Sequence, residues 1–280
     1  MTAVTPPPRT PVPSLAARAR LITDAVPQAV VCRQAAAHLW GLSVLPCPEP
    51  EWPVEIAAPV HLPVPDTITY VTALPAADVT QHAGVRLTTR ERTALDCART
   101  LPRLDAVAAL DQFARRGVDL ETLWRHPLNS WHVRDTISMA DPGAASPRES
   151  WLRVILVDGG LPRPATQVPV PLGHRCVYLD LGWEDYRLGV EYDGREHHTA
   201  PGDVRRDADR REELRARGWR VIPVRGDVVP VRAGDLLQVV ANALIECGWR
   251  PGPDGMTRVL RRIRAARRRP DAPPLRRRRH

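Results

Sequence analysis

Apolar and polar residues in the second half of the chain follow two alternating patterns. Runs with strand-like apolar spacing are separated by segments with helical spacing, and Gly159-Gly160 and Gly218 end two of the predicted helices. The predicted order is helix, strand, strand, helix, strand and helix over 146–160, 168–183, 186–194, 202–218, 219–224 and 233–248, with a further strand left open. This order has too many strands for a helical bundle and is too short for a Rossmann fold, so we predict a mixed α/β class.

The first half of the chain predicts a smaller α+β domain. The expected elements are helices in 14–26 and 31–42, extended stretches in 54–64, 67–74 and 85–88, and two more helices in 88–100 and 101–117. Thr88 and Glu91 have capping-box spacing at the start of the third helix, and Gly117 is placed to end the fourth. These elements are compatible with a winged-helix module, although periodicity alone does not establish one.

Composition sets the expected domain boundaries. The proline-rich residues 1–13 are expected to be disordered, and DPGAAS at 141–146 has the composition of a linker. We therefore predict an N-terminal domain in 14–140, a second domain in 146–248 and an arginine-rich tail in 249–280.

The net charge of +8 is concentrated in that tail. The chain contains no lysine, and residues 258–280 hold eleven arginines against the single acid Asp271, so the rest of the chain is slightly acidic. Such a segment can bind nucleic acid without sequence preference, or it can be a solvated and partly disordered end. The sequence leaves both alternatives open.

Other features exclude several classes of protein. The five cysteines are odd in number and include no CxxC pair, which argues against a disulfide framework or a zinc knuckle. The N-terminus lacks the apolar core of a signal peptide, and no apolar run approaches the ~18 residues that span a membrane. We expect a cytoplasmic protein with no membrane partner.

The stretch LDLGWEDYRLGVEYDGREHH at 179–198 carries six acidic residues and two histidines beside strand-like apolar residues. If the strands turn at 184–185, residue 180 pairs with 189, and Asp180 and Glu191 become diagonal neighbours on one face. Asp193 returns to that face two residues later. Converging carboxylates repel one another, so either a divalent cation such as Mg²⁺ or Mn²⁺ or nearby arginines must compensate them.

An ordered series of residues from 146 to about 224 resembles the PD-(D/E)XK nuclease superfamily. Within it, the chain looks like proteins whose C-terminal domain is similar to very-short-patch-repair (Vsr) endonucleases. The matching residues are Glu149, Asp180 in YLDLGW, Glu191 in VEYDG, Gly194, His197, Asp207, Arg210, Leu214, Gly218 and Trp219. The resemblance implies a restriction-endonuclease-like core, with a central mixed sheet flanked by helices, that hydrolyses DNA phosphodiester bonds using Mg²⁺ or Mn²⁺.

The resemblance also implies roles for individual residues. Asp180 and Glu191 become the metal ligands, and Glu149 becomes a supporting acid. His197 becomes a general base or phosphate contact. Asp193 stands where the superfamily has its lysine, which makes it a candidate catalytic position and places activity in question.

Three arginines complete the expected site. Arg195, Arg206 and Arg210 are the candidate DNA contacts, although Arg210 and Asp207 are also placed to hold their helix against the site.

Each of these residues also has a structural interpretation. Glu149 is three residues after Ser146, the spacing of a capping box, and Asp193 with Gly194 makes a good turn. His197 follows that turn and would then be an exposed loop residue.

The N-terminal region shows a fainter likeness, in CRQAAAHLWGL and LTTRERTALDCAR, to AbiEi-type antitoxin proteins. It implies a winged-helix DNA-binding segment. The expected function is a metal-dependent DNA endonuclease. The alternative is a non-catalytic DNA-binding or antitoxin-like regulator that retains a nuclease fold.

Overall fold

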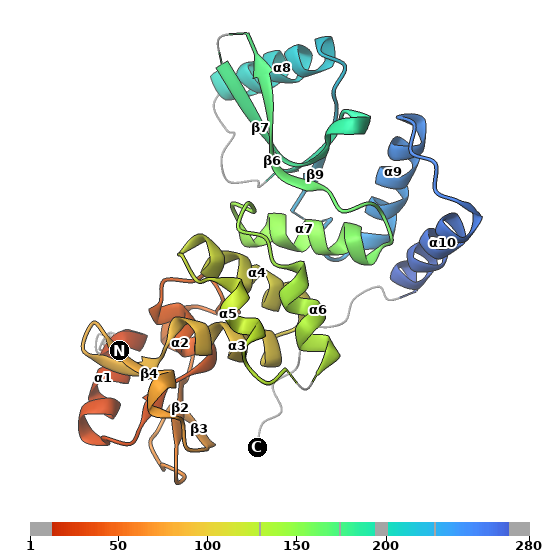
Figure 1. Ribbon diagram of the computed structural model, residues 1–280. Coiled ribbons are helices and arrows are strands. Elements are labelled where there is room, and N and C mark those ends of the chain that lie inside the picture. The colour runs from red at the N-terminus through yellow and green to blue at the C-terminus, as the bar shows by residue number, and fades with distance from the viewer. Residues whose placement is uncertain (1–12, 129, 174, 194–200, 227, 269–280) are drawn as a thin grey trace, which may run out of the picture. The chain divides into compact units, whose positions relative to one another are not determined.

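The computed structural model describes residues 13–268 except 129, 174, 194–200 and 227, and for 201–207 it describes the backbone alone. The chain forms two compact units (Figure 1). Unit 1 comprises Met1–Pro102 and Arg116–Ile137, and unit 2 comprises Arg103–Arg115 and Ser138–His280. Both units contain a mixed sheet and helices, so the predicted mixed α/β class is confirmed.

Unit 1 is built on a five-stranded sheet in the order β3-β2-β1-β5-β4. Its elements are α1 (Leu15–Ala25), β1 (Val30–Val31), α2 (Arg33–Leu39), η1 (Glu49–Glu51), β2 (Val54–Ala58), β3 (Thr67–Val71), η2 (Ala76–Asp78), β4 (Val79–His82), β5 (Val85–Thr88), α3 (Arg90–Thr100) and α5 (Leu120–Trp124), while α6 (Trp131–Met139) crosses the unit boundary. Helices α1 and α2 pack on the sheet, where Leu15, Val31 and Ile56 belong to one buried cluster.

The cap of helix α3 differs from the sequence prediction. Thr89 is the N-cap, because its hydroxyl accepts a hydrogen bond from the Arg92 N–H at 3.2 Å. Thr88 was expected to fill this position, but it is fully buried in β5 and its hydroxyl bonds to that of Thr93 at 2.7 Å. The helix therefore begins one residue later than the capping-box spacing indicated.

Unit 2 is built on a four-stranded sheet in the order β6-β7-β8-β9. Its elements are α4 (Arg103–Arg115), α7 (Pro147–Asp158), β6 (Ala165–Leu172), β7 (Arg175–Trp183), η3 (Glu184–Tyr186), β8 (Leu188–Asp193), α8 (Pro201–Ala216), β9 (Arg220–Arg225), α9 (Ala233–Glu246) and α10 (Pro253–Arg267). Strands β6, β7 and β8 are successively antiparallel, and β9 joins β8 in parallel after the α8 crossover.

Two apolar clusters of unit 2 hold helices to the sheet. Helices α7, α9 and α10 share a large cluster with Leu181 and Val190, whereas α8 contributes Leu214 to a second cluster with Leu179 and Val168. The helix predicted in 146–160 forms as α7, with Ser146 as its N-cap and Pro147 as its first residue.

The segment 168–183, predicted as one strand, is a hairpin of two strands. Strand β6 ends at Leu172, and β7 begins at Arg175 after Gly173, whose φ of +67° suits a turn. Apolar residues lie on both sides of Gly173 and Arg175, which is why the pattern reads as one strand. The sheet thus has one strand more than the two predicted before α8, and the additional strand comes from this hairpin.

Helix α4 joins unit 2 through a buried ion pair. Arg153 of α7 donates to Asp111 of α4 at 2.7 Å, and both side chains are fully buried. Arg153 also donates to the carbonyl of Met139, and the second oxygen of Asp111 accepts the Asp141 N–H at 2.7 Å. The predicted boundary at 140 therefore needs correction, because α4 lies in the sequence of the first domain but packs in the second.

The predicted tail also needs correction. Its first part is helix α10, and Val259 and Ile263 of this helix are buried in the large cluster of unit 2. The predicted disorder of 1–13 falls almost entirely on residues 1–12, which lie outside the described part of the chain. The rest of the predicted tail, 269–280, lies outside it as well. Among the described residues, none of the helices is both long and apolar enough to span a membrane.

Candidate active site

The regular alternation of side chains along β7 breaks at Asp180. Leu181 packs in the same cluster as Val190, but Leu179 belongs to the cluster on the α8 side. A Cβ atom added at Gly189 would lie 2.7 Å from Leu179 Cδ1, so Leu179 lies over the face of β8 opposite to Val190. Residues two apart in a regular strand share a face, and their separation here indicates a local irregularity at Asp180.

The ladder between β7 and β8 stops at the same place. Its last pair is Leu181 with Val190, and beyond it Asp180 Oδ2 accepts the backbone N–H of Tyr192 at 2.8 Å. A carboxylate thus replaces a strand carbonyl as the partner of Tyr192. The backbone pairing of β7 with β8 therefore ends at Asp180, and the Asp180 side chain provides the next hydrogen bond between the two strands.

Strand β6 has a matching irregularity. Gln167 has φ of +48°, and it falls between the pairs of Thr166 and Val168 with β7, at the point opposite Asp180. A residue other than glycine in the left-handed region is strained, and such strain gathers at functional sites. The Gln167 side chain donates to Glu149 Oε2 at 3.2 Å, which links the irregular strand to helix α7.

Glu149 is buried and belongs both to the helix cap and to the site. Its backbone N–H donates to the Ser146 hydroxyl at 3.3 Å, and its carboxylate accepts the Ala145 N–H at 2.8 Å. The capping interpretation is therefore correct in part, with Ala145 as the donor where a capping box would use Ser146. The same carboxylate lies close enough to Asp180 to raise its pKa.

Glu191 is paired with an arginine of helix α8. Arg210 donates to both oxygens of the Glu191 carboxylate, at 2.9 Å to Oε2 and more closely to Oε1, and it donates to the Tyr178 carbonyl at 3.2 Å. The pair is largely shielded, with 26% of the Arg210 side chain and 17% of the Glu191 side chain exposed. This geometry supports the expectation that Arg210 holds α8 against the site.

The register between β7 and β8 differs from the sequence prediction. Gly182 faces Gly189, where residue 180 was expected, because η3 and the left-handed Arg187 lengthen the connection. Asp180 and Glu191 are consequently the first residues beyond the last backbone pair, Leu181 with Val190. They lie across from each other and not on a diagonal.

The three carboxylates share one electrostatic environment. The pKa of Asp180 is raised to about 6, chiefly by burial and then by the neighbouring charges of Glu149 and Glu191, while the Tyr192 N–H and Arg210 oppose the shift. Helix α7 and strands β7 and β8 therefore bring three separated acids into one negative site. A cation would offset the charge that raises the pKa of Asp180.

The chemistry of these residues suits a hard cation, with one condition. Carboxylate oxygens are the ligands that Mg²⁺ and Mn²⁺ prefer, and Asp180 and Glu191 could supply them. Arg210 already bonds both oxygens of Glu191, so Glu191 could bind a cation only after Arg210 releases it. Within the described residues, no group of three or more histidine, cysteine or acidic side chains is arranged to hold a metal ion.

The remaining predicted residues are placed only in part. Asp193 ends β8, half-buried and opposite Arg225 in the parallel ladder. Arg195 and His197 lie outside the described residues, as does the side chain of Arg206. Gln167 was not among the predicted site residues, and its polar side chain directly before the apolar run VPVPL was the available signal.

Comparison with known proteins gives relatives without an activity. No family model matches the chain, and no solved structure matches it significantly. Two curated proteins of Mycobacterium tuberculosis are similar to it: the uncharacterized protein Rv2248 of strain H37Rv and the uncharacterized protein MT2308 of strain CDC 1551. Each is 33% identical over 176 residues, which are 59% of this chain and 64% of the relative. The chain thus spans less than two thirds of the length of the curated relatives it matches, and what it is similar to is a pair of mycobacterial proteins of unassigned activity.

Proposed function

We propose that unit 2 is a metal-dependent endonuclease domain that hydrolyses DNA phosphodiester bonds. One observation carries the proposal: Asp180 occupies the irregular end of the β7–β8 ladder, with Glu149 and Glu191 near enough to raise the pKa of its carboxyl. A structural network would pair these acids with arginines one by one. Only Glu191 has an arginine as a direct partner among the interactions of these three side chains in the described residues.

The arrangement of the unit supports the same proposal. A mixed sheet flanked by helices, with one acid on the first helix and two on neighbouring strands, is what the resemblance to the PD-(D/E)XK superfamily implies. We therefore propose that the core of unit 2 is restriction-endonuclease-like. The winged-helix character proposed for unit 1 rests on the likeness to AbiEi-type antitoxins.

The residues of the proposed site have different roles. Asp180 and Glu191 would hold Mg²⁺ or Mn²⁺, which when bound supplies charge neutralisation and polarisation of the phosphodiester. Glu149, fixed by Ala145 and Gln167, maintains the negative field at Asp180. If Glu191 held a cation, Arg210 could direct its fork toward a phosphate oxygen.

A non-catalytic DNA-binding regulator is the second candidate. It is favoured by the bidentate pair of Arg210 with Glu191, which neutralises one proposed ligand, and by Asp193 at the position of the superfamily lysine. In this alternative the pair is a permanent tie between α8 and β8.

The two candidates differ in cation-dependent cleavage. We expect the full chain to nick supercoiled plasmid DNA with Mg²⁺ or Mn²⁺ and to stop with excess EDTA. Asp180→Asn should remove the nicking while leaving DNA binding intact. Binding to DNA without any cleavage under all cation conditions would support the regulator and refute the endonuclease.

A further inference from the structure

Helix α10 is fixed to unit 2 along one face. Val259 and Ile263 are 1% and 2% exposed in the large apolar cluster, and Ala266 packs against it. The helix lies very close to α9, because a Cβ added at Gly234 would come within 3.2 Å of the Ile263 carbonyl oxygen. The orientation of α10 about its own axis is thus set by the core.

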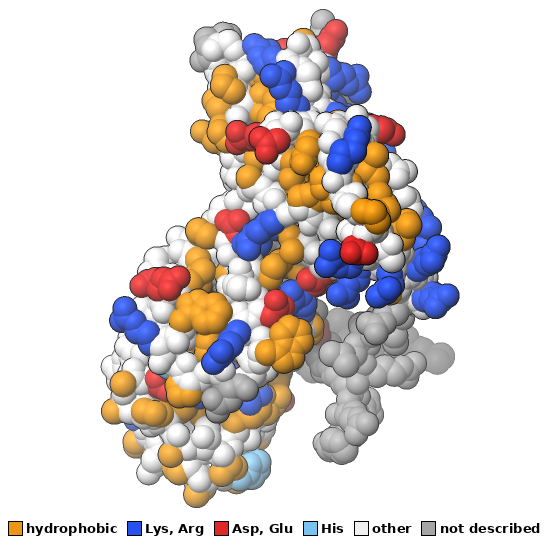
Figure 2. Space-filling view, turned by 45° about the vertical axis from the view of Figure 1, so that its right-hand side comes forward, with side chains coloured by type: hydrophobic (Ala, Val, Ile, Leu, Met, Phe, Trp, Pro, Cys, Tyr) orange, Lys and Arg blue, Asp and Glu red, His pale blue; other side chains and the backbone are white. Residues whose placement is uncertain are grey.

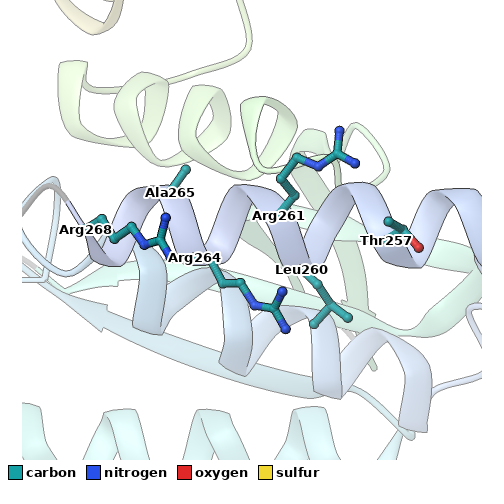
Figure 3. Close-up of a pocket in the computed structure, with 6 residues that line it drawn as sticks. All are labelled: Thr257, Leu260, Arg261, Arg264, Ala265 and Arg268. Atoms are coloured by element: carbon teal, nitrogen blue, oxygen red, sulfur yellow. The ribbon is translucent and has the colours of Figure 1, made fainter.

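The opposite face of α10 carries three exposed arginines. At 100° per residue, Arg261, Arg264 and Arg268 point within a narrow sector directly away from Val259 and Ile263. Figure 3 shows their guanidinium groups extending from successive turns of the helix. Basic side chains also gather at the end of unit 2 that carries α10 in the space-filling view (Figure 2).

The charge of this face is not compensated locally. Asp254, in the first turn, is the only acidic residue of α10. Asp235 of α9 forms its ion pair with the neighbouring Arg267, at 3.0 Å. Within the part of the chain that the structure describes, Arg261, Arg264 and Arg268 form no ion pair. Three like charges within two turns repel one another, so they favour an external anion.

We propose that this face of α10 binds the phosphate backbone of duplex DNA. The three arginines lie about 4.5 and 6 Å apart along the helix axis, at 1.5 Å per residue, so they can contact successive phosphates of one strand. The arginine fork bonds phosphate oxygens bidentately, and a helix held by its core presents these forks without a cost for ordering the backbone. The proposal deepens the proposed function, on which it rests for the identity of the polyanion.

An anionic membrane would attract the same charges, but the structure favours DNA. A helix that binds in a membrane interface buries its apolar face among lipids. The apolar face of α10 is already buried in the protein, and Leu260, at 38% exposure, is the large apolar residue left beside the arginines. The exposed face can therefore make contacts with phosphates but cannot insert.

The test compares two triple variants of the full chain with equal change in charge. The first replaces Arg261, Arg264 and Arg268 with glutamine. The matched control replaces Arg175, Arg220 and Arg250, which are bonded to Glu213, Glu246 and the Ile245 carbonyl. Binding of a fluorescent DNA duplex is followed by anisotropy over a series of salt concentrations in EDTA, and thermal unfolding confirms that each variant is folded.

We expect the first variant to bind at least about tenfold more weakly, and its slope of log affinity against log salt to fall by about 3, close to 0.9 per lost phosphate contact. The control should retain its slope. Equal losses in both variants, or no loss in the first, would overturn the assignment, as would tighter binding to phosphatidylserine vesicles than to DNA. Because EDTA prevents cleavage, loss of binding here is distinct from failure of the endonuclease, which would leave this binding intact.

Discussion

Arg210 of helix α8 donates to both carboxylate oxygens of Glu191 in strand β8. Its third contact, to the carbonyl of Tyr178 in β7, lets one guanidinium join the helix both to β8 and to the strand that carries Asp180. A bidentate pair of this kind is stronger and more directional than a surface ion pair. The pair therefore contributes both to holding α8 and to the charge that acts on Asp180.

Replacing Arg210 with glutamine is expected to raise the pKa of Asp180 above about 6, because Arg210 lowers it and Glu191 would lose its neutralising partner. Carbon-detected NMR titration of the aspartate carboxyl groups measures the shift. Arg211→Gln, at an exposed position of the same helix, is the control and should leave the Asp180 pKa unchanged. A lower or unaltered pKa in Arg210→Gln would show that the pair does not govern the site.

Asp180 also makes stability depend on pH. Its folded pKa of about 6 lies above the ordinary value, so between about pH 4 and 6 the folded state keeps a proton that the unfolded state has released. Stability from this group is full below about pH 4 and is lost as the pH rises through 6.

Asp180→Asn removes this loss and can still accept the Tyr192 N–H. After allowing for solvent screening, we expect the variant to gain about 1–2 kcal/mol relative to the wild type between pH 4 and pH 7. Urea unfolding in EDTA at both pH values measures the change. If the difference in free energy of unfolding between the two proteins were the same at pH 4 and pH 7, the Asp180 pKa would not be raised.

The buried pair of Asp111 and Arg153 is expected to be essential to unit 2. Asp111→Ala leaves the Arg153 charge buried without its partner and should cost about 3–5 kcal/mol in free energy of unfolding. Combining it with Arg153→Met should cost far less than the sum of the two single changes. Chemical denaturation of all four proteins tests this, and strictly additive losses would show that the two residues do not act as a pair.

Two changes at the start of α7 separate capping from the site. Ser146→Ala removes the hydroxyl that accepts the Glu149 N–H and should cost about 1 kcal/mol of stability. Glu149→Gln retains an acceptor for the Ala145 N–H, so stability should hold, but it removes a charge that raises the Asp180 pKa.

We expect Glu149→Gln to lower both the Asp180 pKa and the cleavage rate, and Ser146→Ala to leave both nearly unchanged. Carboxyl titration and plasmid nicking measure them. A Glu149→Gln protein whose only defect is stability would assign this residue to the cap alone.

Local signals in the sequence predicted much of unit 2. Ser146, Pro147 and the glycines that follow the helices mark element ends by capping and backbone conformation, which depend on neighbouring residues. The expected position of Asp180 and Glu191 on adjacent strands is confirmed, although the pairing was wrong. The pairing depends on the η3 turn and on Arg187 in the left-handed region, and no pattern of apolar residues indicates either.

Contacts distant in sequence could not be predicted. The placement of α4 in unit 2 follows from Asp111 meeting Arg153, which are 42 residues apart. Helix α10 had a usable signal, since Val259, Ile263 and Ala266 recur at helical spacing, but the arginines between them gave the segment the composition of a tail. The left-handed backbone conformation of Gln167 is not indicated by the residues next to it in the sequence.

The endonuclease site is tested most directly by the single-turnover rate of Mg²⁺- or Mn²⁺-dependent plasmid nicking, measured for three proteins purified in parallel. These are the wild type, Asp180→Asn, and a control, Glu213→Gln, whose altered carboxylate pairs with Arg175 away from the three acids of the site. We predict that Asp180→Asn slows nicking at least about a hundredfold, a loss of about 2.7 kcal/mol in transition-state stabilisation, and that Glu213→Gln matches the wild type. Equal rates in all three proteins, or no cation-dependent nicking by the wild type, would contradict the assignment of an endonuclease site to Asp180.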